Sequence, residues 1–159
     1  MTSPVLPSAI YGPLVPNYLA SDLVMQKSIG TNASLCRIFT QGTGEYPPQV
    51  LGHFVDVRDL AQAHIAALSS SLIPGRKKRI LISNTTFKLK DVAELIHRER
   101  PELAHRLPRQ DAVPPKQTDA PLDKSSALEI LGMKEYIPWE ETVLAAIDAG
   151  VAWEKVHSA

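Results

Sequence analysis

The side chains best suited to acid–base chemistry are two carboxylates, Asp56 and Asp59, and a neighbouring histidine, His53. Paired carboxylates can serve as acid and base. Asp56, however, ends an apolar segment, and Asp59 has a residue type favoured at a helix start, so we expect structural roles for both. His53 could donate a hydrogen bond to a hydroxylated ligand, although an exposed loop position is the more common case.

A second histidine, His64, and the single cysteine, Cys36, give weaker indications. His64 lies opposite the polar stripe of its helix, where a buried imidazole bonded to a backbone carbonyl is commoner than a base. Cys36 lies in the apolar stretch 35–39, which indicates an inert buried thiol. A lone cysteine excludes an intramolecular disulfide and a cysteine-rich metal site, and no clustered Asp/Glu/His spacing indicates a metal.

The Gly-Thr-Gly at positions 42–44 lies in a loop, QGTGEYPP, over 41–48. A dinucleotide fingerprint should follow a strand and open a helix, whereas two prolines follow here. We therefore do not interpret this segment as a phosphate-binding loop.

The segment that positions these residues is 54–68, FVDVRDLAQAHIAAL, where an apolar strand runs directly into an amphipathic helix. The polar positions of the helix share one stripe, and apolar residues fill the rest of its circumference. We expect a helix that is covered on most sides, as in a layered α/β domain.

The remaining elements follow from periodicity and punctuation. We expect strands over 5–11, 35–40 and 80–83, and helices over 17–29, 88–100, 123–131 and from Pro138 onward. Trp139, Val143, Ile147 and Val151 recur every fourth residue and indicate a core-facing stripe. This alternation of strands and helices predicts an α/β fold.

Residues 101–122 contain five prolines. We expect them to form an extended surface connector without regular structure. The full chain, 1–159, is expected to be a single region.

Composition excludes several classes of protein. Apolar residues make up 44%, and 17 basic residues balance 17 acidic ones, so nothing steers the chain to nucleic acid. No apolar run approaches the roughly 20 residues of a membrane span, and the first residues lack a secretory signal. We expect a soluble, cytoplasmic protein.

Three segments carry a family resemblance: FVDVRDLAQAH (54–64), PSAIYGP (7–13) and DKSSALEILGM (123–133). Together, and in their order along the chain, they resemble the extended short-chain dehydrogenase/reductases, particularly the dihydroflavonol-reductase-like and cinnamoyl-CoA-reductase-like members and their fungal relatives. The resemblance implies an α/β fold that is the C-terminal portion of a Rossmann-type reductase, with the N-terminal βαβ units missing. It also implies that the strand over 5–11 belongs to a sheet whose other strands precede Met1.

The family reduces a carbonyl with NADPH or NADH, using a tyrosine as acid and a lysine four residues later that lowers the pKa of the tyrosine. The positions four residues after the tyrosines hold no lysine: they are Val15, Asp22, Val50 and Glu140. The glycine-rich pyrophosphate loop is also absent. We therefore expect no catalytic residue in this chain, and we expect it to be a truncated form of the family's proteins.

The resemblance also implies which residues would line a shared pocket. Pro7, Ser8, Ala9 and Ile10 would lie beside the nicotinamide. Tyr18, Gly52 and His53 would contact the substrate, although a glycine at position 52 departs from the plant reductases.

The leading hypothesis is thus the substrate-binding portion of an NADP- or NAD-dependent reductase of an aldehyde, ketone or flavonol-type carbonyl, inactive alone and without a metal. One alternative is a non-catalytic protein that forms a homo- or heterodimer with a full-length reductase. The other is a fragment of a sugar-nucleotide epimerase or dehydratase.

Overall fold

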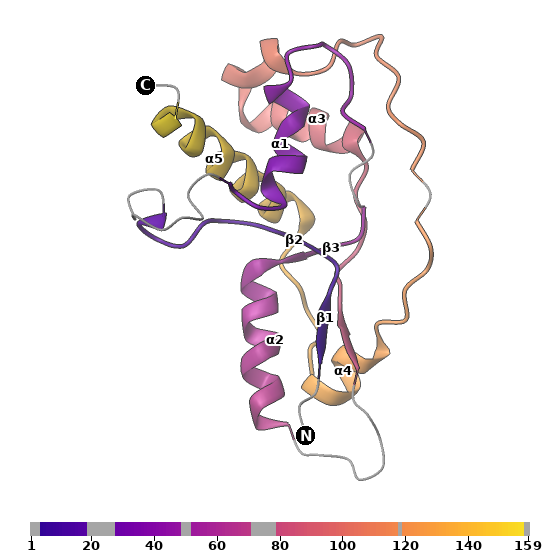
Figure 1. Ribbon diagram of the computed structural model, residues 1–159. Helices are drawn as coiled ribbons and strands as arrows, with labels where there is room; N and C mark the ends of the chain where they lie inside the picture. The colour runs from indigo at the N-terminus through magenta and orange to yellow at the C-terminus, as the bar shows by residue number, and fades with distance from the viewer. Residues whose placement is uncertain (1–3, 19–27, 49–51, 71–78, 118, 158–159) are drawn as a thin grey trace.

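The computed structural model describes residues 4–18, 28–48, 52–70, 79–117 and 119–157. The elements, shown in Figure 1, are β1 (Val5–Pro7), β2 (Ala9–Tyr11), α1 (Asn32–Thr40), β3 (Phe54–Asp56), α2 (Val57–Ser69), β4 (Ile80–Ile82), α3 (Leu89–Glu99), the 3-10 helix η3 (Pro101–Arg106), α4 (Ser125–Leu131) and α5 (Trp139–His157).

One extended segment, 5–11, supplies two strands and changes its neighbour at Ser8. β1 pairs in parallel with β4, and β2 pairs in parallel with β3. At the break the amide of Ser8 donates to the carbonyl of Ile82 at 3.1 Å, and the amide of Ala9 donates to the carbonyl of His53 at 3.2 Å. The segment therefore ties together two strands that are distant in sequence.

This arrangement confirms the strand expected over 5–11. Within this chain its partners are β4 and β3. Among the described residues each half of the segment has one hydrogen-bonded neighbour.

The strand β3 separates two hydrophobic cores. Successive side chains of a strand point to opposite faces. Phe54 accordingly joins the cluster formed with α1, α3, η3 and α5, and Val55 joins the cluster formed with β4, α2 and α4; both side chains are fully buried. In Figure 1 these two groups of elements lie on opposite sides of the β2–β3 pair.

The strand expected over 35–40 is wrong, because these residues belong to α1. Their apolar side chains recur at helical spacing on one buried face: Leu35, Cys36, Ile38 and Phe39. A short apolar run fits a buried strand and a buried helix equally well, and packing against α5 decides between them. The helix expected over 17–29 lies largely outside the described residues.

The later elements agree with the sequence. The expected strand over 80–83 is β4, and the expected helices over 88–100 and 123–131 are α3 and α4. Gly132 ends α4 in the left-handed conformation, with φ of 69°. On α5, Val143 and Ile147 are fully buried, and Trp139 and Val151 pack beside them.

The helix α2 follows β3 without a spacer, as expected, but its coverage is less than expected. Ile65 is 67% exposed and Leu68 is 90% exposed. With the exposed Val57 and Ala61 they occupy one side of the helix at spacings of four, four and three residues. We call Val57, Ala61, Ile65 and Leu68 the α2 stripe.

The proline-rich segment also differs from expectation at its start. Residues 101–106 form η3, with Pro101 in the first turn and Leu103 buried. Proline is tolerated there because the first amides of a helix have no intrahelical acceptor. The described residues between 107 and 122 contain no helix or strand, and in Figure 1 this orange segment runs from η3 to α4.

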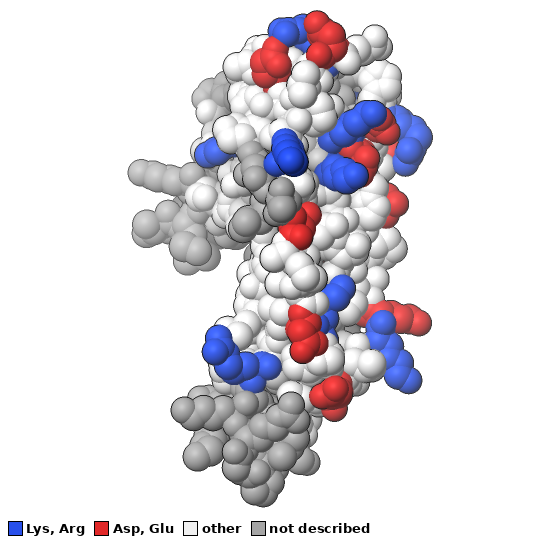
Figure 2. Space-filling model, turned by 90° about the vertical axis from the view of Figure 1, so that its right-hand side faces the viewer, with Lys and Arg blue, Asp and Glu red and all other residues white. Residues whose placement is uncertain are grey.

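Charged side chains of both signs intermix on the face shown in Figure 2. Among the described residues several oppositely charged side chains are paired, including Arg100 with Asp148 and Arg106 with Glu154, both at 2.7 Å. That face shows no extended field of one sign.

Gly150 on α5 lets α1 approach closely. A Cβ at this position would overlap the Sγ of Cys36 and lie 3.3 Å from its Cβ. The thiol in turn donates to the carbonyl of Ala146 at 3.6 Å. The close contact between the two helices therefore depends on a glycine in the middle of α5.

We predict that Gly150→Ala lowers the free energy of unfolding by about 1–3 kcal/mol, because an added methyl overpacks this contact. In an unconstrained helix the same change would stabilise by up to about 1 kcal/mol. Urea denaturation measures the difference. Cys36→Ala is the control background, in which Gly150→Ala should be neutral or stabilising. An equal loss of stability in both backgrounds would show that the contact with Cys36 is not its cause.

Candidate functional site

The carboxyl ends of β2 and β3 meet around one buried carboxylate, Asp56. Its side chain caps α2 by accepting the amide of Arg58 at 2.8 Å. It also accepts the Nε and Nη2 of Arg58, each at 2.9 Å, and the hydroxyl of Thr142 on α5 at 2.8 Å. Asp56 thus joins a strand, the helix that follows it and the last helix of the chain.

Gly12, directly after β2, packs against this carboxylate. Its φ is 135°, and a Cβ there would lie 3.1 Å from Val57 and 3.3 Å from the Asp56 oxygens. The buried Asn32 binds both backbone groups of Gly12, accepting the amide at 3.2 Å and donating to the carbonyl at 2.8 Å. These bonds fix the direction in which the chain leaves the sheet.

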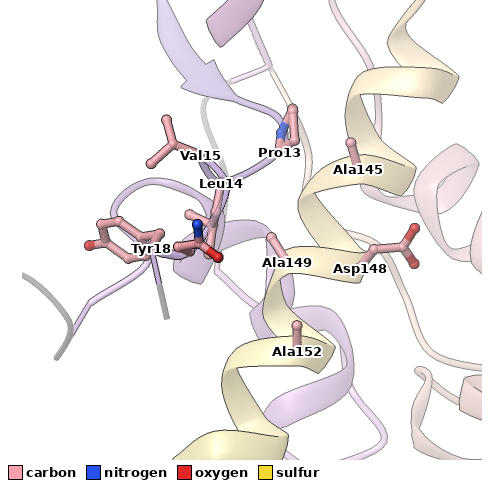
Figure 3. Close-up of a pocket in the computed structure, with 9 residues that line it drawn as sticks. Pro13, Leu14, Val15, Tyr18, Ala145, Asp148, Ala149 and Ala152 are labelled. Atoms are coloured by element: carbon pink, nitrogen blue, oxygen red, sulfur yellow. The ribbon is translucent and has the colours of Figure 1, made fainter. Parts of the chain in front are cut away.

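The chain then forms one wall of a groove of about 480 Å³, and α5 forms the other. We call it the α5 groove; its lining residues are Pro13, Leu14, Val15, Asn17, Tyr18, Ala145, Asp148, Ala149 and Ala152. In Figure 3 the three alanines face the 13–18 segment across the groove, whereas Asp148 points away. The Asp148 carboxylate is bound by Arg100 at 2.8 and 2.7 Å, so the groove is mainly apolar.

Tyr18, one of the three predicted substrate contacts, lines this groove, and its hydroxyl donates to the carbonyl of Ser28 at 3.0 Å. The alanine wall was missed in the sequence. The large apolar residues of α5 lie on its core-facing stripe, which the sequence analysis identified. The alanines at 145, 149 and 152 repeat at helical spacing on another face, and that pattern alone does not distinguish the wall of a groove from a packed contact.

The predicted nicotinamide-side residues, Pro7, Ser8, Ala9 and Ile10, lie where the strand segment changes its neighbour. The Ser8 amide and hydroxyl are both directed to the carbonyl of Ile82, at 3.1 and 3.5 Å. Ser8 is half-buried, and Ala9 is bonded to His53. The structure therefore brings this group and one predicted substrate contact together.

The other two predicted substrate contacts, Gly52 and His53, lie immediately before β3. Gly52 is buried, and a Cβ there would overlap the Gln117 amide and lie 2.9 Å from the Asp119 carboxylate. The ring Nε2 of His53 is 2.7 Å from the carbonyl of Ala120. Both residues are thus covered by Gln117, Asp119 and Ala120 of the connector that joins η3 to α4.

Because β2 and β3 are parallel, Tyr18 and His53 lie at opposite ends of the pair. Tyr18 follows the carboxyl end of β2, and His53 precedes the amino end of β3. The three predicted substrate contacts therefore do not line one pocket of the described structure.

The two carboxylates at the start of α2 have opposite electrostatic environments. Burial alone would raise the pKa of Asp56, but hydrogen bonds from Arg58 and Thr142 together hold it below its ordinary value. Burial raises the pKa of Asp59, and the nearby negative charge of Asp56 adds to this effect. Asp59 lies in the first turn and accepts the amide of Ile137 at 2.9 Å; the helix cap expected at Asp59 is instead Asp56.

Both carboxylates therefore have structural partners, as expected. His64 binds the carbonyl of Leu60 at 2.8 Å, which confirms its expected partner, but its side chain is exposed and the expected burial is wrong. Cys36 is buried, and this burial, with a smaller effect of the Glu154 charge, raises the pKa of its thiol to about 12. The described residues contain no group of three or more His, Cys, Asp or Glu side chains placed to hold a metal ion.

Parallel strands joined through helices, with a groove at the carboxyl end of one pair, define a Rossmann-type α/β protein. In the part of the chain that the structure describes, no helix is long and apolar enough to cross a membrane.

Comparisons with known proteins extend this assignment. No family model matches the chain. The Candida albicans protein GRP2, named for NADPH-dependent methylglyoxal reductase activity, is 32% identical over 98 residues, which are 58% of this chain and 27% of that protein. The Saccharomyces cerevisiae NADPH-dependent methylglyoxal reductase GRE2 is 25% identical over 134 residues, which are 82% of this chain and 37% of that protein.

The crystal structure of Gre2 from Candida albicans matches with a TM-score of 0.68 and 24% identity, covering 96% of this chain and 44% of that one. A yeast methylglyoxal/isovaleraldehyde reductase, Gre2, solved with NADPH, matches with a TM-score of 0.64 and 22% identity, covering 95% and 46%. These relatives are reductases of the extended short-chain dehydrogenase/reductase superfamily, the family that the sequence resembles, and the chain spans less than half of their length.

We predict that the two carboxylates respond oppositely to conversion into amides. At pH 7 Asp56→Asn should lower the free energy of unfolding by about 2 kcal/mol, because Arg58 and Thr142 lose a charged acceptor. Asp59→Asn should be neutral or stabilising, because it removes a charge that burial disfavours and keeps an acceptor for Ile137.

The pH dependence follows from the two pKa directions, and denaturant unfolding between pH 3 and 7 measures it. The stability from Asp56 is complete above the ordinary aspartate pKa of about 3.9 and is lost as pH falls through its lowered folded value. The cost of charged Asp59 is complete above its raised folded pKa and disappears below about pH 3.9. Equal losses in both variants at pH 7 would contradict this assignment.

Proposed function

We propose that the chain is the substrate-binding region, residues 1–159, of an NADPH-dependent reductase that acts on small aldehydes or ketones. The observation that carries the proposal is the match of 95% of the chain to a yeast reductase named for methylglyoxal and isovaleraldehyde and solved with NADPH. The curated Saccharomyces relative is also named as an NADPH-dependent methylglyoxal reductase.

The α5 groove is the region that we assign to the substrate. It lies beyond the carboxyl end of a parallel strand pair, which is where ligands bind in open α/β sheets. Its lining is mostly Ala, Pro, Leu and Val, with the Tyr18 ring at one end. Such a lining suits the short alkyl group of an aldehyde.

The chemistry requires groups that this chain does not supply. NADPH would provide the hydride. The chain has no glycine-rich pyrophosphate loop and no tyrosine followed four residues later by lysine. We therefore propose that the 159-residue chain alone neither binds NADPH nor reduces a carbonyl.

The direct test titrates the purified chain with NADPH and follows NADPH fluorescence. We predict no saturable quenching and no NADPH oxidation on addition of methylglyoxal or isovaleraldehyde. A chimera that joins the chain to the remaining portion of the Saccharomyces relative should oxidise NADPH with these substrates. Saturable binding by the chain alone, or an inactive but folded chimera, would contradict the proposal.

The groove assignment is tested in the same chimera with Ala152→Phe. The ring fills part of the groove, so we predict about a tenfold or larger rise in KM for isovaleraldehyde, with the KM for NADPH unchanged. Leu128→Phe on α4, which is half-exposed and outside the groove, is the matched control. Equal effects of the two changes would place the substrate elsewhere.

A second candidate function is a non-catalytic protein that pairs with a reductase, and the α2 stripe favours it. Parallel strands are normally covered on both faces, and this stripe leaves apolar side chains of the covering helix in solvent. The occupant that fits is the nucleotide-binding portion of a related reductase.

This candidate predicts association in trans. The chain mixed with the nucleotide-binding portion of the Saccharomyces relative should form a 1:1 complex in sedimentation velocity. Ile65→Lys/Leu68→Lys should weaken the complex at least tenfold, because two apolar contacts are lost. Leu128→Lys is the control. If the double change left the affinity of the complex unaltered, the α2 stripe would be excluded as the contact surface. If the chain associated with itself, the partner that covers the stripe would be a second copy of the chain.

A further inference from the structure

The connector between η3 and α4 is attached to the body by the ion pair of Arg109 with Glu45 and by four hydrogen bonds. The Arg109 amide donates to the carbonyl of Gly44 at 2.8 Å, and the Gln117 amide group donates to the carbonyl of Phe87 at 3.1 Å. The carbonyl of Ala120 is bonded to His53, and the Nζ of Lys124 donates to the carbonyl of Asn84 at 2.7 Å. The partners on the body are Gly44 in the loop after α1, His53 before β3, and Asn84 and Phe87 between β4 and α3. The connector is therefore bonded to several separate segments of the chain.

Beyond its first residues the connector has few apolar contacts. Leu107, at its start, packs against the first hydrophobic core and is partly buried. Val113 is 81% exposed, and Lys116, Asp119 and Ala120 are also exposed. Between Arg109 and α4, hydrogen bonds of modest net strength therefore determine whether the connector lies against the body.

Gly52 is the position against which the connector closes. The Gln117 amide nitrogen, at the end of a side chain, occupies the volume that a Cβ of residue 52 would need, so the observed placement of Gln117 depends on glycine at this position. Gln117 also donates to the Asp119 carboxylate at 2.8 Å, so its position is fixed from two sides.

We propose that Gly52, Gln117, Asp119 and the His53–Ala120 bond form a clasp that holds the connector as a strap over the amino end of β3, and that this strap opens without unfolding of the two cores. Opening exposes His53 and the Gly52 backbone, beside the point where Ala9 joins the sheet. Gly52 is the positioning residue, since its missing side chain admits Gln117. The proposal concerns the isolated chain and does not depend on the reductase assignment.

The test uses trypsin cleavage after Lys116, in the strap, and after Arg37, on the exposed face of α1. Cleavage after Lys116 reports strap opening and cleavage after Arg37 reports opening of the core, provided that opening equilibrates faster than cleavage. Rates are quantified by mass spectrometry. Each Lys116 rate is divided by the rate on a peptide of residues 107–124 with the same sequence, which corrects for changes next to the cleaved bond.

Gly52→Ala should accelerate cleavage after Lys116 about five- to tenfold, as expected for loss of one or two hydrogen bonds, and leave cleavage after Arg37 unchanged. Gln117→Ala should accelerate it similarly. In the Gln117→Ala background, Gly52→Ala should have no further effect, because the space is then free.

Three results would overturn the proposal. Gly52→Ala could leave the Lys116 rate unchanged, which would show that the clasp does not hold the strap. It could accelerate cleavage after Arg37 equally, which would mean global destabilisation. The effects of Gly52→Ala and Gln117→Ala could also multiply in the double variant, which would separate Gly52 from Gln117.

Discussion

The buried carboxylate of Asp56 is the interaction on which the arrangement of the other elements depends. A fully buried charge is tolerated only when its lone pairs are occupied, and here Arg58 and Thr142 occupy them. The same group caps α2, so the strand cannot end elsewhere without leaving the helix amides unpaired. Thr142 extends this constraint to α5 and thereby to the wall of the groove.

The switch of strand pairing at Ser8, from β4 to β3, also determines how the elements are connected. Because the segment 5–11 pairs with β4 first and β3 second, one continuous stretch of backbone contacts both cores. β3 then separates the cores, with Phe54 on one side and Val55 on the other. A groove forms at the carboxyl end of the β2–β3 pair, and the clasp forms at its amino end.

Much of this fold could be predicted from the sequence, for identifiable reasons. The strand-to-helix junction at 54–68 and the stripe on α5 have unambiguous periodicity, and Gly132 ends α4 as glycine commonly does. The run at 35–39 was misassigned because four apolar residues around one arginine fit two kinds of element, and only the contact with α5 distinguishes them. The exposure of Ile65 and Leu68 was also unpredictable, since periodicity reports an apolar face and not what covers it.

The candidate site was harder to predict because it depends on contacts between distant residues. Gly12, Gly52 and Gly150 look alike in the sequence, yet each is glycine for a different reason: a positive φ beside Asp56, a space filled by Gln117, and a helix contact with Cys36. The partner of Gly52 is 65 positions away and has no periodic signal. The resemblance placed Gly52 and Tyr18 in one pocket, whereas the parallel pairing of β2 and β3 separates them. Strand direction, which the resemblance alone did not consider, therefore decides which of these residues can act on the same ligand.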